Sequence, residues 1–109
     1  HRINRRQRQM CIRDSLDTLA DGCAGGIDED TLTLPLAKAV IDSVIDCTEE
    51  QIIEAIKILA WDENLLVEGS AALALAGFLQ DKNSEKQKVS LVLLCGGNFD
   101  KDLLLPILN

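Results

Sequence analysis

The stretch VSLVLLCGGN, Val89 to Asn98, decides how the chain is interpreted. Its first seven residues form a short, β-branched-rich apolar run, which is typical of a strand buried on both faces of a parallel sheet. Two glycines then end the run, and glycine permits a tight turn and a close approach of backbone to a ligand. We therefore predict a buried strand over 89–95 with a candidate binding turn at its carboxyl end.

Working outward from this run, the clearest helix is TEEQIIEAIKILAWDEN, residues 48–64. Thr48 and Gln51 have the spacing of a capping box, and Cys47 can staple to Ile52. The apolar positions then fall on one face of the helix, which is the pattern of a core-facing helix. This face comprises Ile52, Ile53, Ile56, Leu59 and Ala60.

The other elements complete an alternation of helices and strands. Residues 70–79 are apolar nearly all round and rich in Ala and Gly, which predicts a buried helix whose small side chains let neighbouring backbones approach. Shorter helices are predicted over 34–42 and 101–108, and a second short strand over 43–47. This order predicts an α/β fold with at least two parallel strands. In such folds, ligands bind beyond the carboxyl ends of the strands.

Charge is distributed unevenly along the chain. All five arginines lie in the first fifteen residues, which carry about +4, whereas the remaining residues carry six lysines against seventeen acids. A body this acidic is a poor binder of nucleic acid or of an anionic membrane surface, because both depend on cations. No apolar run approaches the length of a membrane span.

Three interpretations of the arginine-rich leader compete. It has the composition of a basic nucleic-acid arm or of an organellar transit peptide, but no apolar core follows that would make it a secretory signal. The run RRQRQMCIRDS, 5–15, also resembles one reading frame of a transposon-end sequencing adapter. We therefore exclude residues 1–15 from fold reasoning as an artefactual leader, which we expect to be disordered, with Met10 and Ile12 packing on nothing.

Several classes of site are excluded for the remaining 94 residues. The single histidine, His1, lies in the leader, which removes His-based triads and metal sites. Cys23, Cys47 and Cys95 lack metal-ligand spacing, and an odd count without a secretion signal favours reduced thiols in the cytosol.

Two positions are candidates for chemistry. Glu68 to Ser70 open the predicted buried helix, where free N–H groups and the helix dipole favour an anion. Cys95 to Asn98 leave the apolar strand. Each has a simpler alternative: Cys95 can be a small buried hydrophobe, and Glu68 a helix-terminal carboxylate making local hydrogen bonds.

Three segments, taken in their order and spacing along the chain, resemble a known enzyme family. They are LADGCAGG (19–26), VEGSAALALAGFL (67–79) and VSLVLLCGGNFD (89–100). They resemble the C-terminal third of threonine/serine dehydratases, which are pyridoxal-phosphate enzymes of the tryptophan-synthase β-subunit fold (fold type II) and have serine racemase as a relative. The resemblance implies that residues 16–109 are the C-terminal part of a three-layer, parallel-sheet cofactor domain. It also implies a small hydroxy amino acid substrate, an N-terminal remainder of the same enzyme, and a homo-oligomeric, cytoplasmic parent.

The resemblance also implies residue roles. Cys95 occupies the position of the serine or cysteine that hydrogen-bonds the pyridine nitrogen of pyridoxal 5′-phosphate, Gly96 and Gly97 shape the turn beneath the ring, and Glu68 is the family glutamate near it. A thiol cannot stabilise a protonated ring nitrogen as a carboxylate would. The substrate would therefore expel its β-hydroxyl promptly, giving a 2-oxo acid and ammonia.

The sequence departs from the family pattern in three respects, and these departures leave alternative functions open. The Schiff-base lysine motif, the run of four glycines that holds the phosphate, and the divalent-cation ligands of some members have no match here, so the chain by itself has no catalytic residue and should be inactive. Two alternatives stay open: an amino-acid racemase of the same family, and a non-catalytic acidic α/β interaction module.

Overall fold

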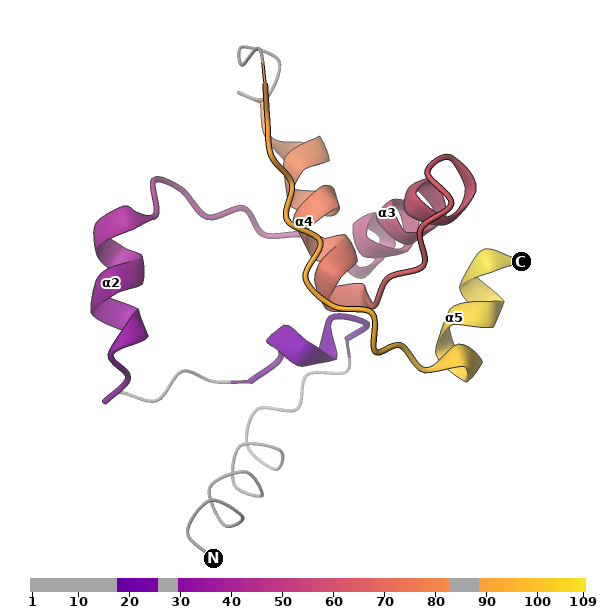
Figure 1. Ribbon diagram of the computed structural model, residues 1–109, viewed down its shortest axis with the longest axis horizontal. Helices are drawn as coiled ribbons and strands as arrows, with labels where there is room; N and C mark the ends of the chain where they lie inside the picture. Colours follow the sequence, from indigo (N-terminus) through magenta and orange to yellow (C-terminus); the bar gives the residue numbers. More distant parts are fainter. Residues whose placement is uncertain (1–17, 26–29, 83–88) are drawn as a thin grey trace, which may run out of the picture.

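The computed structural model describes residues 18–25, 30–82 and 89–109, and the predictions for the leader lie outside them. Helices dominate these parts of the chain (Figure 1). Helices α3 and α4 pack together, with α5 against α3 and the short 3₁₀ helix η1 against α4. In chain order the elements are η1 (Asp21–Cys23), α2 (Thr33–Val40), α3 (Glu49–Trp61), α4 (Gly69–Gln80) and α5 (Lys101–Leu108).

Helix α3 confirms the prediction from its sequence. The Thr48 hydroxyl accepts a hydrogen bond from the Gln51 backbone N–H at 3.3 Å, and the Gln51 side chain accepts one from the Thr48 N–H at 2.8 Å. At its other end Asn64 adopts a left-handed φ of 57°, and the Leu65 N–H donates to the Leu59 carbonyl at 2.8 Å. The left-handed Asn64 ends the helical path, and the bond ties the chain that follows back to the last turn of α3.

The core lies where α3 meets α4. Ile52, Ile56 and Leu59 of the predicted stripe are buried, as is Ala55. Helix α4 contributes small buried residues, which let the two helix backbones approach closely, and Ala20, Val67 and Leu104 complete the cluster. The prediction for α4 holds for one face only, because Leu79 at its far end is half exposed. The buried residues of α4 are Gly69, Ala71, Ala72 and Ala76.

The predicted strands are not formed in the described residues. Residues 43–47 and 89–95 are neither helix nor strand, and Leu94 of the second segment packs against the core. No backbone hydrogen bond joins residues 89–95 to another described residue. A strand requires such partners from a neighbouring strand. The segment is therefore strand-like in sequence but unpaired here.

The unpaired segment exposes apolar surface, as its composition predicts for a strand without neighbours. Val89 is 87% exposed and Leu91 94%, whereas Val92 and Leu94 on the alternate positions are half-buried. Exposed apolar surface of this kind marks an interaction site or an aggregation risk. The prediction of a strand buried on both faces is wrong for the chain as it stands, because one face has no covering layer.

Helix α2 is likewise peripheral. It forms where predicted, with Pro35 in its first turn, but none of its residues is buried. No helix within the described ranges is long and apolar enough to cross a membrane.

Candidate functional site

Glu68 stands immediately before α4, and its side chain does not cap that helix. The residue is the N-cap by position, with extended backbone (φ −74°, ψ 163°), yet its carboxylate accepts no hydrogen bond from the first turn. The carboxylate instead lies against Gly96. The simpler interpretation of Glu68 as a local capping residue is therefore not what the structure shows.

Gly96 is a position that only glycine fits. Its φ is +126°, which side-chain-bearing residues rarely adopt. A Cβ added there would lie 1.7 Å from Glu68 Oε1 and 2.5 Å from its Cδ. The fold thus brings together two of the predicted site residues that are 28 positions apart in the sequence.

The two remaining predicted residues face open space. No atom lies within 4 Å of the position that a Cβ on Gly97 would take. Cys95 carries an exposed, free thiol, so its interpretation as a buried hydrophobe does not describe this structure. The turn that follows the apolar segment is therefore crowded on the side of Gly96 and open on the side of Cys95 and Gly97.

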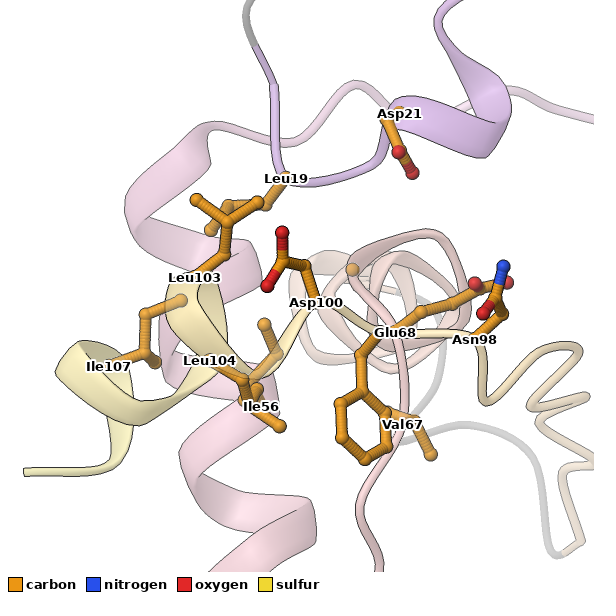
Figure 2. Close-up of a pocket in the computed structure, with 12 residues that line it drawn as sticks. Leu19, Asp21, Ile56, Val67, Glu68, Asn98, Asp100, Leu103, Leu104 and Ile107 are labelled. Carbon is orange, nitrogen blue, oxygen red and sulfur yellow. The ribbon is translucent and has the colours of Figure 1, made fainter.

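A small pocket of about 50 Å³ adjoins Glu68 (Figure 2). Asn98 lines it, and Figure 2 shows the Glu68 side chain extending toward the Asn98 amide. Asp21 and Asp100 add two further carboxylates to the lining. With three acids around it, this pocket does not favour the anion that was predicted for the start of α4.

Asn98 lies within the predicted candidate range Cys95 to Asn98, but no individual role was assigned to it from the sequence. It is the last residue of the CGGN turn, so its position beside two glycines was the available indication. Asp21 and Asp100 reach the pocket from η1 and from the N-cap of α5, where Asp100 accepts a hydrogen bond from the Asp102 N–H at 2.8 Å. Both residues lie in segments that carry the family resemblance, but no local pattern in the sequence places them beside Glu68. No group of three potential metal ligands comes together among the described residues.

The η1 segment presses directly on the start of α4. A Cβ on Gly69 would lie 2.0 Å from the Leu19 carbonyl oxygen, and one on Gly22 would lie 2.8 Å from Ser70 Oγ. The Ser70 hydroxyl is buried and has no hydrogen-bond partner among the described residues. Two glycines therefore permit a close approach of η1 to α4, which fixes one wall of the pocket.

Helix α3 anchors the same segment from the other side. The Glu49 carboxylate accepts hydrogen bonds from the Thr18 hydroxyl and, at 2.9 Å, from the Leu19 N–H. One glutamate thereby joins the chain entering η1 to the first residue of α3. The site is positioned by helix packing and by this carboxylate.

Comparison with known proteins assigns the family. The model of the family "Pyridoxal-phosphate dependent enzyme" matches residues 3–96. The chain belongs to this family. The membership supports an α/β fold and identifies pyridoxal phosphate as the family's cofactor, although the described residues themselves are helical.

The chain is also similar in sequence to individual curated proteins. The chain is 35% identical over 92 residues to an L-threonine ammonia-lyase of Thermotoga maritima, covering 84% of this chain and 22% of the relative. It is 34% identical over 96 residues to a serine racemase of Dictyostelium discoideum, covering 85% of this chain and 29% of that protein. A catabolic L-threonine dehydratase of Staphylococcus aureus is 35% identical over 86 residues, covering 76% of this chain and 25% of the dehydratase. The chain thus spans between a fifth and a third of the length of these relatives.

Proposed function

We propose that this chain is part of a pyridoxal-phosphate-dependent threonine/serine ammonia-lyase, which eliminates the β-hydroxyl of a small hydroxy amino acid to give a 2-oxo acid and ammonia. The observation that carries the proposal is the 35% identity to an L-threonine ammonia-lyase over 92 residues, which cover 84% of this chain. A serine racemase at 34% identity keeps racemisation as the second candidate activity.

In this proposal, residues 16–109 belong to the cofactor-binding α/β domain. The boundary at residue 16 rests on the change in arginine usage, whereas the family match begins at residue 3. Residues 89–95 would become a parallel strand when the remaining strands of the three-layer domain pair with them, which would cover the exposed Val89, Leu91 and Leu93. The free cysteines accord with a cytosolic location, and the parent enzyme would be a homo-oligomer.

The residues present suit the cofactor. Its planar ring needs a surface without side chains, and the turn at Gly96 and Gly97 offers backbone alone, open beyond Gly97. The exposed Cys95 thiol would donate a hydrogen bond to the pyridine nitrogen and, because it is no carboxylate, would leave that nitrogen unprotonated. Glu68, beside Gly96, would face the ring edge. When bound, the cofactor supplies an electron sink for the bond broken at the substrate α-carbon.

A chimera tests this proposal. Residues 18–109 would replace the matching segment of the Thermotoga maritima L-threonine ammonia-lyase, which supplies the parts of the enzyme that this chain does not match. We expect the chimera to release ammonia and a 2-oxo acid from threonine or serine, with the 2-oxo acid exceeding any D-amino acid formed. A folded chimera that bound cofactor but formed mainly the D-amino acid would favour racemisation instead.

Variants at Cys95 test its role within the chimera. Cys95→Ser should be mild, whereas Cys95→Ala should weaken cofactor affinity by about 0.5–1.5 kcal/mol, the worth of one hydrogen bond. Cys95→Asp should shift the product ratio away from elimination, because a carboxylate would hold the ring nitrogen protonated. If Asp and Ala gave the same product ratio, Cys95 would not be the partner of the ring nitrogen.

A further inference from the structure

The chain segment 18–23 is tied to the start of α3 by the Glu49 side chain. Its carboxylate accepts hydrogen bonds from the Thr18 hydroxyl and, at 2.9 Å, from the Leu19 N–H. The Thr18 hydroxyl oxygen in turn accepts a hydrogen bond from the Ala20 N–H at 3.2 Å, and Ala20 is buried in the core. One carboxylate thus organises three consecutive residues of the segment.

Leu19 connects this carboxylate with the start of α4. Its N–H donates to Glu49, whereas its carbonyl oxygen lies 2.0 Å from the position that a Cβ on Gly69 would take. Gly69 is buried and directly follows Glu68 in the chain. Leu19 and Glu68 also line the same pocket (Figure 2). Because the N–H and the carbonyl belong to one residue, a displacement of Leu19 from Glu49 also displaces it from Gly69.

Glu68 depends on this backbone for its position. Its carboxylate makes no capping hydrogen bond to the first turn of α4, and it lies against Gly96. Its place at the Gly96 turn is therefore set by the backbone that carries it, which is the start of α4. That backbone is the part of α4 on which Leu19 presses.

The neighbouring residue Glu50 provides a comparison. Glu49 and Glu50 both lie in the first turn of α3, where the helix dipole favours a carboxylate. Glu49 is half-buried and bonded to the segment 18–23, whereas Glu50 is exposed and interacts with the Thr48 hydroxyl of its own cap. The two acids therefore match in charge and in place on the helix, but only Glu49 holds Leu19.

We propose that Glu49 is a positioning residue of the site. By holding Leu19 against Gly69 it fixes the start of α4, and with it the Glu68 carboxylate, at the Gly96 turn. Glu49 is not among the residues that line the site pocket, so it acts through Leu19 and Glu68. Its effect on catalysis rests on the proposed function, in which Glu68 faces the ring of the cofactor. A displacement of about 1 Å at a reacting centre can lower a rate by about a hundredfold.

A double-mutant cycle in the 109-residue chain tests the mechanical part of this proposal without any activity. Gly69→Ala should lower the urea midpoint of unfolding, because its methyl group overlaps the Leu19 carbonyl. In a Glu49→Ala background Leu19 can move away, so the same substitution should lower the midpoint by less than about half as much. In a Glu50→Ala background the full decrease should remain. If Glu49→Ala gives no measurable transition, Thr18→Ala removes one donor to the same carboxylate and takes its place. Equal decreases in the two backgrounds would overturn the proposal.

The chimera described above tests the catalytic part. Glu49→Ala should lower kcat/KM for threonine by about ten- to a hundredfold, whereas Glu50→Ala should have little effect. Glu49→Gln should keep most of the activity, because its amide oxygen can still accept the Leu19 N–H.

The decisive variant combines Glu49→Ala with Glu68→Gln in the chimera. If Glu49 acts through Glu68, Glu49→Ala should cost little more once Glu68 is replaced. An equal loss with and without Glu68→Gln would show that Glu49 serves stability alone and would overturn the positioning role. An inactive unsubstituted chimera would count against the proposed function instead, while the cycle in the 109-residue chain would still decide whether Glu49 holds Leu19 against Gly69.

Discussion

The α3–α4 pair and the segments around it differ in what holds them. Helices α3 and α4 bury Ile52, Ile56 and a run of small residues against each other, and α3 carries a complete capping box. Helix α2 buries none of its residues, and residues 89–95 bury only part of Val92 and Leu94, although both segments are also rich in apolar residues. Apolar composition therefore predicts burial only where the chain itself supplies the opposing surface. Where it does not, the surface stays exposed.

The largest difference in unfolding free energy between the two regions should come from shortening a side chain in the core. Ile56→Ala, on the buried face of α3, should lower the free energy of unfolding by about 2–5 kcal/mol, because it leaves a cavity between packed helices. Leu36→Ala on α2, where the side chain is 61% exposed, is the matched control and should change the unfolding free energy little. Urea unfolding followed by circular dichroism measures both. Equal losses for the two variants would show that α2 is part of the core.

A second comparison concerns two glycines with opposite surroundings. Gly69→Ala should destabilise the chain by about 1–3 kcal/mol despite the higher helix propensity of alanine, because the new methyl group would overlap the Leu19 carbonyl. Gly97→Ala should change stability little, since its Cβ position is open. Unfolding midpoints of the two variants give the measurement. A stabilised Gly69→Ala variant would mean that η1 does not press on α4.

The smallest expected effect concerns the start of α3. Thr48→Ala should cost about 1 kcal/mol of stability, because it removes the hydroxyl that caps the Gln51 N–H. Thr33→Ala, at the start of the unburied helix α2, is the control and should have a smaller effect.

Lowering the pH should reduce the stability that the Thr48 cap gives to α3. Hydrogen bonds from its own backbone and from the Thr48 hydroxyl lower the pKa of Glu50 in the folded chain. A lowered folded pKa gives a stabilising contribution that is present above the unfolded pKa and lost as the pH falls through the folded value. The difference between wild type and Thr48→Ala should therefore shrink in acid. A difference that grew on acidification would contradict this sign.

The sequence by itself determined helices α2 to α5 and the family, whereas the short helix η1 was not predicted. The capping box at Thr48 and the stripe through Ile52, Ile56 and Leu59 specify α3 locally, because helix hydrogen bonds and caps join residues three or four apart. The family could be read from VEGSAALALAGFL and CGGN, since these short motifs keep their order and spacing.

Tertiary structure alone decided the rest. Glu68 contacts Gly96, which is 28 positions away in the sequence, and Gly69 contacts the Leu19 carbonyl, which is 50 positions away. No local sequence pattern encodes these contacts. The strand predicted over 89–95 depends in the same way on distant partners, because every ladder hydrogen bond of a strand goes to another segment. Without such partners among the described residues, an apolar, strand-forming sequence stays unpaired.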